Sequence, residues 1–255
     1  MFTVNLLFPV LNEKKRLANG IEQTVAYMEA FNRTNDPVSY RCTILDNGSD
    51  DETPEIAQDL CRKYPCKVFY RRIEERGVGI AFRTGVQENE CEIVGYMDID
   101  LSTDIRNLGK TIELFRDDPS LQYVNGTRFA KDSRTIGRKW YRKITSAGLV
   151  FLLKTTLHMK ATDGICGFTF MRKDVAGKLV AEAYDDRGWF YMIELLLRAE
   201  RSGVRILDMP VTFTENYDTT VNVGKTIRNY LTRIAALRRQ FALEDRDHHR
   251  RNNHA

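Results

Sequence analysis

The sequence lacks any apolar run long enough to span a bilayer. A spanning helix needs about 20 apolar residues, but the longest candidate, residues 147–153, ends at Lys154. The first ten residues (MFTVNLLFPV) also lack a basic segment and run directly into the polar residues 12–15. We therefore expect a first strand here rather than a targeting segment, and we do not expect an integral membrane protein.

Cysteine pairs and linker-like stretches are missing as well. No CxxC pair occurs, and no histidine lies at ligand spacing from the five cysteines, which are Cys42, Cys61, Cys66, Cys91 and Cys166. This pattern argues against a zinc site or a disulfide framework and favours buried thiols in a reducing cytoplasm. No repeat, low-complexity stretch or proline-rich hinge divides the chain, so we expect one domain with a C-terminal extension.

A strong excess of charge is also absent. The 255 residues are 42% hydrophobic and 29% charged, a composition that argues against disordered and fibrous proteins. The formal net charge is +4. A basic balance of this size is as often a solubility setting as a sign of nucleic-acid binding, and we expect no nucleic-acid partner.

The chain does contain a regular alternation of short β-rich runs and helical stretches. Such an alternation indicates parallel β-α-β units in a layered α/β domain. Thr53 and Pro54 mark one helix start, as N-cap and first helical residue. The expected strands are residues 4–10, 41–46, 67–70, 92–98, 121–125, 168–172 and 205–213. The main expected helices are residues 15–31, 105–116, 138–158, 188–202 and 226–243, with others beginning at Thr53 and after Gly79.

Polar or acidic clusters stand at the ends of three of these strands. Ligands of open parallel sheets bind at the carboxyl ends of the strands. The clusters there are residues 9–13, 46–51 and 98–102. Their shared position matters more than the composition of any one of them.

Asp98 and Asp100 form the first candidate site. Residues two apart on a strand point the same way, so both carboxylates are expected to face one point after the apolar run 93–97. Like charges at that separation repel unless a cation lies between them, and Mg2+ or Mn2+ suits such oxygen ligands. We favour a metal site, with a solvated loop as the alternative.

Asp46 lies in the second cluster, Asp-Asn-Gly-Ser-Asp-Asp at residues 46–51. Asn-Gly and Ser-Asp-Asp are ordinary turn residues, so a plain turn is one interpretation. The functional interpretation is that Asp46, the last residue of its strand, accepts hydrogen bonds from a nucleoside.

In order and spacing, these motifs resemble those of family 2 glycosyltransferases. The first set is PVLNE (residues 9–13), DNGSDD (46–51), RGVGIAFRTG (76–85) and DIDLS (98–102). A second set is similar to the branch of dolichol-phosphate mannose synthase and dolichyl-phosphate glucosyltransferase, namely GTR (126–128), WYR (140–142) with Ser146, DGICGF (163–168) and residues 189–196. The resemblance covers about residues 3–216.

The resemblance implies a GT-A fold, a Rossmann-like layered and mostly parallel sheet flanked by helices. It implies a nucleotide-sugar donor, with Pro9, Glu13, Asp46 and Asp98 as nucleotide contacts. It also implies Mg2+ or Mn2+ held by Asp98 and Asp100, which would be catalytic in this way, with Ser102 as a third metal neighbour. A divalent cation stabilises a leaving nucleoside diphosphate as a Lewis acid.

Four positions depart from the family's pattern. The family often has a basic residue where this chain has Val78, so a donor-phosphate contact is missing or is supplied by Arg72 or Arg83. Met192 stands where relatives commonly have Asp. Asp104 and Ile105 replace the usual prolines.

For the acceptor, the resemblance implies a polyprenyl phosphate bound by Arg128, Arg142 and Ser146. A phosphate is already ionised at neutral pH and needs cationic positioning rather than a general base, and the arginine fork suits its oxygens. The alternative is that these arginines only solvate a helix start.

Asp163 is a further catalytic candidate, with loop capping as the equal alternative. If the acceptor were instead a hydroxyl of a saccharide, Asp163 or Glu194 would be the candidate base. Glu194 lies in an apolar helical run, where an acid is either paired or functional. A sugar nucleotidyltransferase would need a glycine-rich phosphate loop after the first strand, which residues 9–13 do not provide. A non-catalytic nucleotide-sugar-binding protein is the remaining alternative.

We expect the catalytic domain to comprise residues 1–216, an amphipathic helix residues 217–243, and a disordered tail residues 244–255. An apolar face of the helix is formed by Ile227, Tyr230, Leu231, Ile234, Leu237 and Phe241. That face predicts either peripheral contact with the cytoplasmic side of a membrane or packing on the domain. A membrane-protein partner is the alternative to direct membrane contact, and a homo-oligomer is the other candidate assembly.

Overall fold

The computed structural model describes residues 2–184, 186–216 and 223–252. It divides into two compact units. The larger unit comprises Met1–Arg138 and Ala161–Asn216, and the smaller one comprises Lys139–Lys160 and Tyr217–Ala255.

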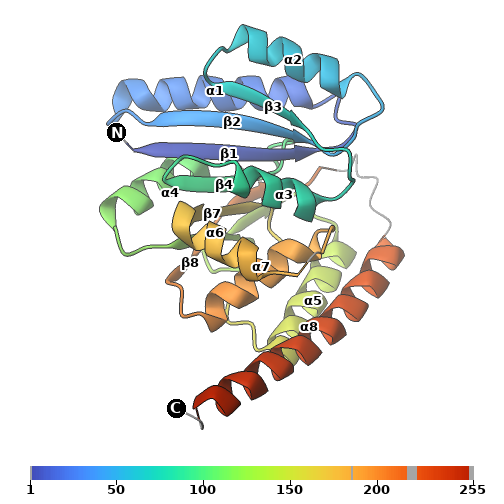
Figure 1. Cartoon of the computed structure of the whole chain (residues 1–255). Coiled ribbons are helices and arrows are strands. Elements are labelled where there is room, and N and C mark those ends of the chain that lie inside the picture. Colours follow the sequence, from blue (N-terminus) through green and yellow to red (C-terminus); the bar gives the residue numbers. More distant parts are fainter. Residues whose placement is uncertain (1, 185, 217–222, 253–255) are drawn as a thin grey trace. The chain divides into compact units, whose positions relative to one another are not determined.

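The larger unit is built on a seven-stranded sheet in the order β3-β2-β1-β4-β7-β5-β8 (Figure 1). All neighbouring strands are parallel except that β7 runs antiparallel to both β4 and β5. The mostly parallel α/β sheet predicted from the sequence is therefore confirmed. The strands are β1 (Thr3–Val10), β2 (Ser39–Asp46), β3 (Val68–Arg72), β4 (Ile93–Met97), β5 (Tyr123–Thr127), β7 (Phe168–Arg172) and β8 (Ile206–Pro210).

Helices cover both faces of this sheet (Figure 1). On one side lie α1 (Leu17–Thr34), α2 (Thr53–Lys63) and α4 (Arg106–Asp117), and on the other α3 (Val78–Gln87), α6 (Lys173–Glu182) and α7 (Phe190–Arg201). The sheet is buried between the two layers, which explains why its central strands are apolar on both faces. Leu6, Phe8, Ile44 and Phe168 are among the fully buried core residues.

Close packing in the sheet depends on one glycine. A Cβ atom at Gly95 of β4 would lie 2.1 Å from the ring of Phe170 on β7. Only glycine therefore lets the two strands pair with that ring lying across them. The arrangement places the end of β4 and the start of β7 beside each other, where Met97 pairs with Phe168.

Two short strands form a separate ribbon. The sequence predicts one strand over residues 205–213, but the structure breaks it into β8 and β9 (Thr212–Thr214). The break follows Pro210, which has no N–H to donate to a ladder. β9 leaves the main sheet and pairs with β6 (Arg134–Ile136), a strand that was not predicted.

The smaller unit is helical, with α5 (Trp140–Leu157) packed against α8 (Val223–Asn252). α5 matches the predicted helix, and it ends at His158 in the left-handed conformation, with φ 56°. α8 continues to Asn252, so residues 244–252 are helical where a disordered tail was predicted, and residues 253–255 lie outside the described residues. In the described part of the chain, no helix is both long and apolar enough to cross a bilayer.

Candidate functional site

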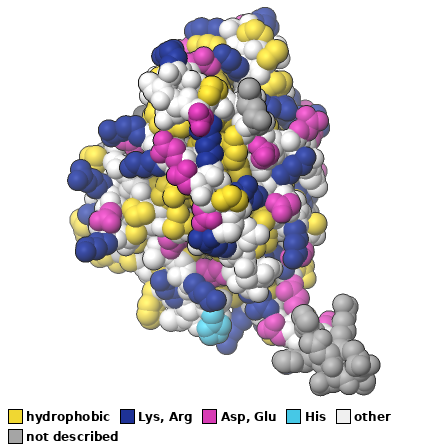
Figure 2. Space-filling view, turned by 90° about the vertical axis from the view of Figure 1, so that its left-hand side faces the viewer, with side chains coloured by type: hydrophobic (Ala, Val, Ile, Leu, Met, Phe, Trp, Pro, Cys, Tyr) yellow, Lys and Arg dark blue, Asp and Glu magenta, His cyan; other side chains and the backbone are white. Residues whose placement is uncertain are grey.

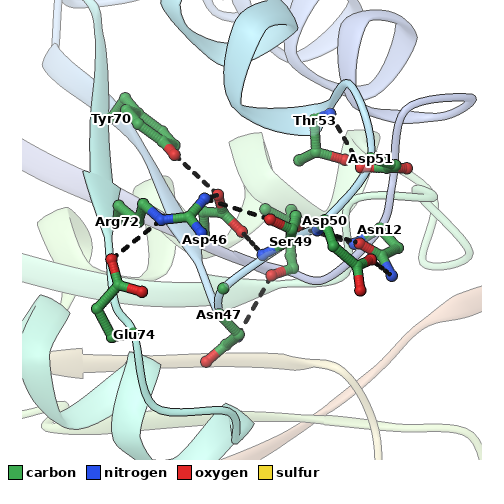
Figure 3. A network of polar contacts seen from close by, with 12 residues as sticks. Asn12, Asp46, Asn47, Ser49, Asp50, Asp51, Thr53, Tyr70, Arg72 and Glu74 are labelled. Atoms are coloured by element: carbon green, nitrogen blue, oxygen red, sulfur yellow. Dashed lines mark hydrogen bonds and ion pairs between the residues drawn. The ribbon is translucent and has the colours of Figure 1, made fainter.

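Two loops at the carboxyl ends of β1 and β2 are joined by side chains. Asn12 adopts a left-handed conformation, with φ 57°. Its backbone N–H donates to Ser49 Oγ at 2.9 Å, and its side-chain amide donates to Asp50 Oδ1 at 2.7 Å while accepting from the Asp50 N–H (Figure 3). The predicted clusters 9–13 and 46–51 therefore form one surface at this edge of the sheet.

Glu13 extends this surface toward the end of β4. Arg16 donates to both oxygens of Glu13, at 2.6 and 2.8 Å, and its Nη1 lies 3.8 Å from Asp100 Oδ2. Burial raises the pKa of Glu13, and the hydrogen bond from Arg16 offsets part of that rise. The Glu13 N–H donates to Thr53 Oγ1 at 2.8 Å, so Thr53 holds this loop instead of capping its own helix, whose N-cap is Glu52.

Asp46 is fully buried and occupies the centre of a polar network (Figure 3). It accepts hydrogen bonds from the Ser49 N–H at 2.9 Å and the Tyr70 hydroxyl at 2.8 Å, and Arg72 Nη1 lies 3.4 Å away. Burial and the bond to Asp46 raise the pKa of Tyr70 to about 12. Arg72 and Arg83 were the expected substitutes for a basic residue at position 78. In the structure Arg72 contacts Asp46, and Arg83 donates to the carbonyl of Tyr184.

Pro9 is partly exposed and pairs in register with Leu45, one residue before Asp46. The two predicted nucleotide contacts therefore lie on adjacent strands, at the edge of the sheet where Glu13 also lies.

Asp98 follows β4 directly and lies in a tight pocket of protein atoms. The Tyr96 hydroxyl donates to its Oδ1 at 2.7 Å. A Cβ atom at Gly167 would lie 1.8 Å from its Oδ2, so only glycine leaves room for this carboxylate. Burial raises the pKa of Asp98 to about 7; the bond from Tyr96 lowers it, and the charge of Asp100 adds to the rise.

Asp100 is held by the turn that follows the strand. Leu101 takes a left-handed conformation, with φ 51°, and the Ser102 N–H donates to Asp100 Oδ1 at 3.0 Å. Ser102 is buried, and its carbonyl accepts the Thr214 N–H at 2.7 Å. Ser102 therefore fixes the orientation of Asp100 and ties it to β9.

The two carboxylates suit a divalent cation that is shared with a phosphate. Among the described residues, no group of three or more His, Cys, Asp or Glu side chains meets where it could hold a metal ion. A cation at Asp98 and Asp100 would take its remaining oxygen ligands from substrate phosphates and water, as Mg2+ does in phosphate-binding enzymes. Its charge would also remove the repulsion between two acids of which one is already costly to ionise.

Arg128 and Asp163 form a buried, bidentate ion pair. Arg128 Nε and Nη2 donate to the two Asp163 oxygens at 2.7 and 3.0 Å, and the Arg128 backbone N–H also donates to Asp163. Asp163 is completely buried and accepts a fourth bond from the Ile165 N–H. Burial lowers the pKa of Arg128, but the charge and hydrogen bonds of Asp163 raise it by more, so the guanidinium stays charged.

This geometry changes the interpretation of Asp163. Its two oxygens accept four hydrogen bonds in this structure, so the catalytic role predicted for it stays a prediction. It caps its loop, as the alternative interpretation held, and it orients Arg128.

Two further acids anchor the loop that carries Asp163. Asp208 Oδ2 accepts both the backbone N–H and the hydroxyl of Thr162, at 2.6 and 2.8 Å, and Oδ1 accepts Asn125 Nδ2 at 2.8 Å. Glu200 accepts the Ala161 N–H at 2.6 Å. The loop is thus attached to β5, β8 and α7 before it reaches Asp163.

Glu194 is buried and paired. Its Oε1 accepts Arg198 Nε at 2.8 Å and the Tyr184 N–H at 3.0 Å. The sequence left open whether this acid was paired or functional, and the structure supplies the partner one helical turn away.

Arg142 and Ser146 belong to α5 in the smaller unit, one turn apart on the same side of the helix. Ser146 is buried and Arg142 is half-buried. Arg128 belongs to the larger unit, so a joint clamp of Arg128 and Arg142 stays a prediction.

Sequence reasoning missed three residues that shape the site: Arg16, Tyr96 and Gly167. The spacing of Tyr96 and Asp98, two apart at a strand end, was a usable signal because it puts both on one side. The i,i+3 spacing of Glu13 and Arg16 was also a signal for their pairing. Gly167 gave no such signal, since its role depends on Asp98, far away in the chain.

The chain is similar in sequence to several glycosyltransferases. The chain is 29% identical over 226 residues to the glycosyltransferase AglD of Haloferax volcanii, an alignment that covers 88% of this chain and 35% of AglD. It is 27% identical to the dolichol-phosphate mannosyltransferase of Pyrococcus furiosus, covering 92% and 63%, and 26% identical to the human dolichyl-phosphate beta-glucosyltransferase, covering 83% and 67%. The chain therefore spans about a third of the first relative and somewhat under two thirds of the second.

Solved structures confirm the GT-A fold. Glucosyl-3-phosphoglycerate synthase from Mycobacterium tuberculosis in complex with UDP superposes with a TM-score of 0.65 at 16% identity, covering 92% of this chain and 80% of that one. The complex of the same enzyme with Mn2+, UDP and glucosyl-3-phosphoglycerate gives 0.63. The family model described as Glycosyl transferase family 2 matches residues 6–180. Because that match spans more than half of its length, the chain belongs to glycosyl transferase family 2.

Proposed function

We propose that the chain transfers a hexose from a UDP- or GDP-sugar to a polyprenyl phosphate at the cytoplasmic face of a membrane. The observation that carries the proposal is the pair Asp98 and Asp100, next to the surface formed by the loops after β1 and β2. The names of the relatives, which include enzymes of dolichyl phosphate, support the acceptor class.

On the donor side, Pro9, Glu13 and Asp46 are the proposed nucleotide contacts. Because Asp46 is buried, it acts mainly by fixing Ser49, Tyr70 and Arg72 around the nucleoside. Asp98 and Asp100 would hold Mg2+ or Mn2+ on the pyrophosphate, with Ser102 fixing Asp100. The bound cation would supply Lewis-acid stabilisation of the leaving diphosphate.

The surroundings of Asp163 and Glu194, the two candidate bases, bear on the choice between a phosphate and a hydroxyl acceptor. A hydroxyl acceptor needs a base within hydrogen-bond reach. Asp163 and Glu194 are both buried, and both are committed to arginine partners. A phosphate needs no proton removed, so these pairs favour the phosphate acceptor over the saccharide hydroxyl.

On the acceptor side, Arg128, Arg142 and Ser146 are the proposed phosphate contacts. Asp163 holds Arg128 through Nε and Nη2, which leaves Nη1 as the donor edge for a phosphate oxygen. Asp163 is thereby a positioning residue in this scheme. Arg142 and Ser146 would present a guanidinium and a hydroxyl from one face of α5.

The test is a transfer assay across UDP- and GDP-sugars, with and without polyprenyl phosphate and Mn2+. We expect one donor to be used only when both additions are present. Arg142→Ala should lower transfer by about one to two orders of magnitude, since a charge-assisted arginine contact contributes about 1.5–3 kcal/mol. Arg142→Lys should recover part of this loss, because it keeps the charge and loses the fork.

The control is Arg62→Ala on the exposed surface of α2, which should keep full activity. Transfer to a free sugar with no response to polyprenyl phosphate would overturn the acceptor assignment. A parallel loss of donor affinity in Arg142→Ala would place Arg142 on the donor side.

A further inference from the structure

α5 presents an apolar stripe to solvent. Trp140, Ile144 and Phe151 are 73%, 62% and 69% exposed. Together with the exposed Ala147 they follow the spacing i, i+4, i+7 and i+11, which places all four on one side of a helix. We call this set the α5 stripe.

The other side of α5 is packed. Ser146, Leu153 and Leu157 are buried, and by helical geometry they lie roughly opposite the α5 stripe. The helix is therefore two-faced, and the exposed aromatic and aliphatic side chains occupy a side distinct from the buried one. Arg142 lies on the buried side, one turn from Ser146.

In the segment around the α5 stripe, the Lys and Arg side chains have no acidic neighbours in sequence. Residues 138–162 contain no Asp or Glu, but they contain Arg138, Lys139, Arg142, Lys143, Lys154 and Lys160. Lys143 and Lys154 are exposed and border the stripe on the helical wheel. By contrast, acidic and basic side chains alternate over the face drawn in Figure 2.

The helix expected to contact a membrane was α8, and its apolar residues are largely covered. Ile234, Leu237 and Phe241 are buried, and Leu231 is exposed. Ile227 is among the residues whose side chains are not described. This burial favours the packing alternative for α8 and leaves α5 as the helix with an exposed apolar side.

We propose that the α5 stripe, with Lys143 and Lys154, is a docking surface for an anionic phospholipid membrane. Large apolar side chains insert at the boundary between headgroups and acyl chains, and flanking lysines bind anionic headgroups. The inference rests on the proposed function, because it explains how an enzyme of a lipid-linked acceptor meets its substrate. It also assigns the two sides of α5 separate tasks, with lipid contact on one and the Arg142 and Ser146 pair on the other.

The test is flotation of the full chain with phosphatidylcholine vesicles that contain or lack 30% phosphatidylglycerol, a composition of about a third anionic lipid chosen to give a strong surface potential. We expect binding only to the anionic vesicles, and weaker binding at high salt. Ile144→Glu with Phe151→Glu should lower the partition coefficient by about tenfold or more, since it removes apolar insertion and adds repulsion. Lys143→Ala with Lys154→Ala should also lower it by about tenfold or more, at about fivefold for each lysine.

Two matched controls each place a glutamate at an exposed leucine outside the α5 stripe. Leu231→Glu tests α8 of the same unit, and Leu207→Glu tests β8 of the larger unit. Both should bind anionic vesicles as the wild type does. Equal loss in Leu231→Glu would overturn the assignment to α5.

Tryptophan fluorescence gives a readout of depth. The chain has two tryptophans, so Trp189→Phe leaves Trp140 as the single reporter. We expect a blue shift on addition of anionic vesicles and quenching by brominated acyl chains. Unchanged emission with bound vesicles would show that α5 stays outside the membrane and would overturn the proposal.

Different results would refute the membrane-docking proposal and the proposed polyprenyl phosphate acceptor. Vesicle binding without transfer to polyprenyl phosphate would leave the docking surface standing and remove the proposed acceptor. Transfer to a short-chain, water-soluble polyprenyl phosphate without vesicle binding would do the reverse. A dimer in light scattering that Phe151→Glu dissociates, with no vesicle binding, would identify the α5 stripe as a protein interface instead.

Discussion

Asp163 accepts two side-chain hydrogen bonds from Arg128, of 2.7 and 3.0 Å, and both side chains are almost completely shielded from solvent. The pair joins residues 35 positions apart, at the end of β5 and in the loop before β7. Breaking a buried ion pair from one side leaves a charge without compensation, which costs about 3–5 kcal/mol.

The first prediction follows from that cost. Asp163→Ala should destabilise the protein by about 3–5 kcal/mol, because it strands a buried guanidinium. The double variant Arg128→Ala with Asp163→Ala should lose clearly less than the sum of the single losses. Urea denaturation of the four proteins measures the coupling, and strictly additive losses would show that the two groups do not act as a pair.

The second prediction concerns the loop anchor. Asp208→Asn should weaken the hold on Thr162, because one of the two carboxylate oxygens becomes a donor facing other donors. Arg128 would then be less well oriented, so we expect KM for the polyprenyl acceptor to rise by about threefold to tenfold with nucleotide affinity unchanged, a loss of about one hydrogen bond.

Asp208→Glu, which keeps the charge and shifts its position, serves as the comparison for that experiment. If nucleotide affinity fell together with acceptor affinity, Asp208 would be supporting the whole fold rather than one side of the site.

The third prediction addresses the metal. Asp98→Asn and Asp100→Asn should each lower transfer by about two orders of magnitude or more, a loss typical of removing a group that stabilises transition-state charge. Chelation of divalent ions should silence the wild type, and added Mn2+ should restore it. Titration of Mn2+ by electron paramagnetic resonance, with UDP or GDP present, reports binding directly.

Stability provides the control for these two variants. Removing one of two repelling carboxylates should leave the Tm in chelator unchanged or higher. Asp59→Asn on the exposed surface of α2 should alter neither activity nor Mn2+ binding. Near wild-type turnover in either site variant at limiting Mn2+ would remove that aspartate from the metal site.

The fourth prediction concerns the nucleotide. Asp46→Ala should weaken binding of UDP or GDP more than it changes turnover at saturation, since the contact serves ground and transition states alike. Tyr70→Phe removes one of the bonds to Asp46 and should have a smaller effect in the same direction. Calorimetric titration measures both variants, with Tyr64→Phe on the far end of α2 as the control. Unchanged affinity in Asp46→Ala would exclude it from the nucleotide site.

The central strands of the sheet, such as β4 and β5, were predictable because their apolar runs are buried on both faces. β6 was not, since its three residues Arg134–Ile136 carry no pattern and pair with β9, far along the chain. The end of α8 was also predicted wrongly, because its sequence has no apolar pattern. A dense mixture of charges predicts disorder, yet residues 244–252 form a helix.

The candidate site divides in the same way. Asp98, Asp100 and Asp46 were found because each stands at a strand end, where position alone carries information. The commitments of Asp163 to Arg128, of Glu194 to Arg198 and of Arg16 to Glu13 were not predicted. The spacings i,i+4 of Glu194 with Arg198 and i,i+3 of Glu13 with Arg16 were usable signals for two of these pairs. Asp163 and Arg128 lie 35 positions apart, so only the fold brings them together.

The antiparallel strand β7 has a consequence for substrate binding. In the loop before this strand, Asp163 binds Arg128, and four residues later the Gly167 carbonyl accepts the Asp98 N–H at 3.2 Å. This segment therefore contacts both the proposed donor site and the proposed acceptor site. We expect that a shift of this loop on binding of one substrate would change the affinity for the other, by the same factor in both directions. The affinity for the donor measured with the acceptor present should therefore differ from the affinity measured without it.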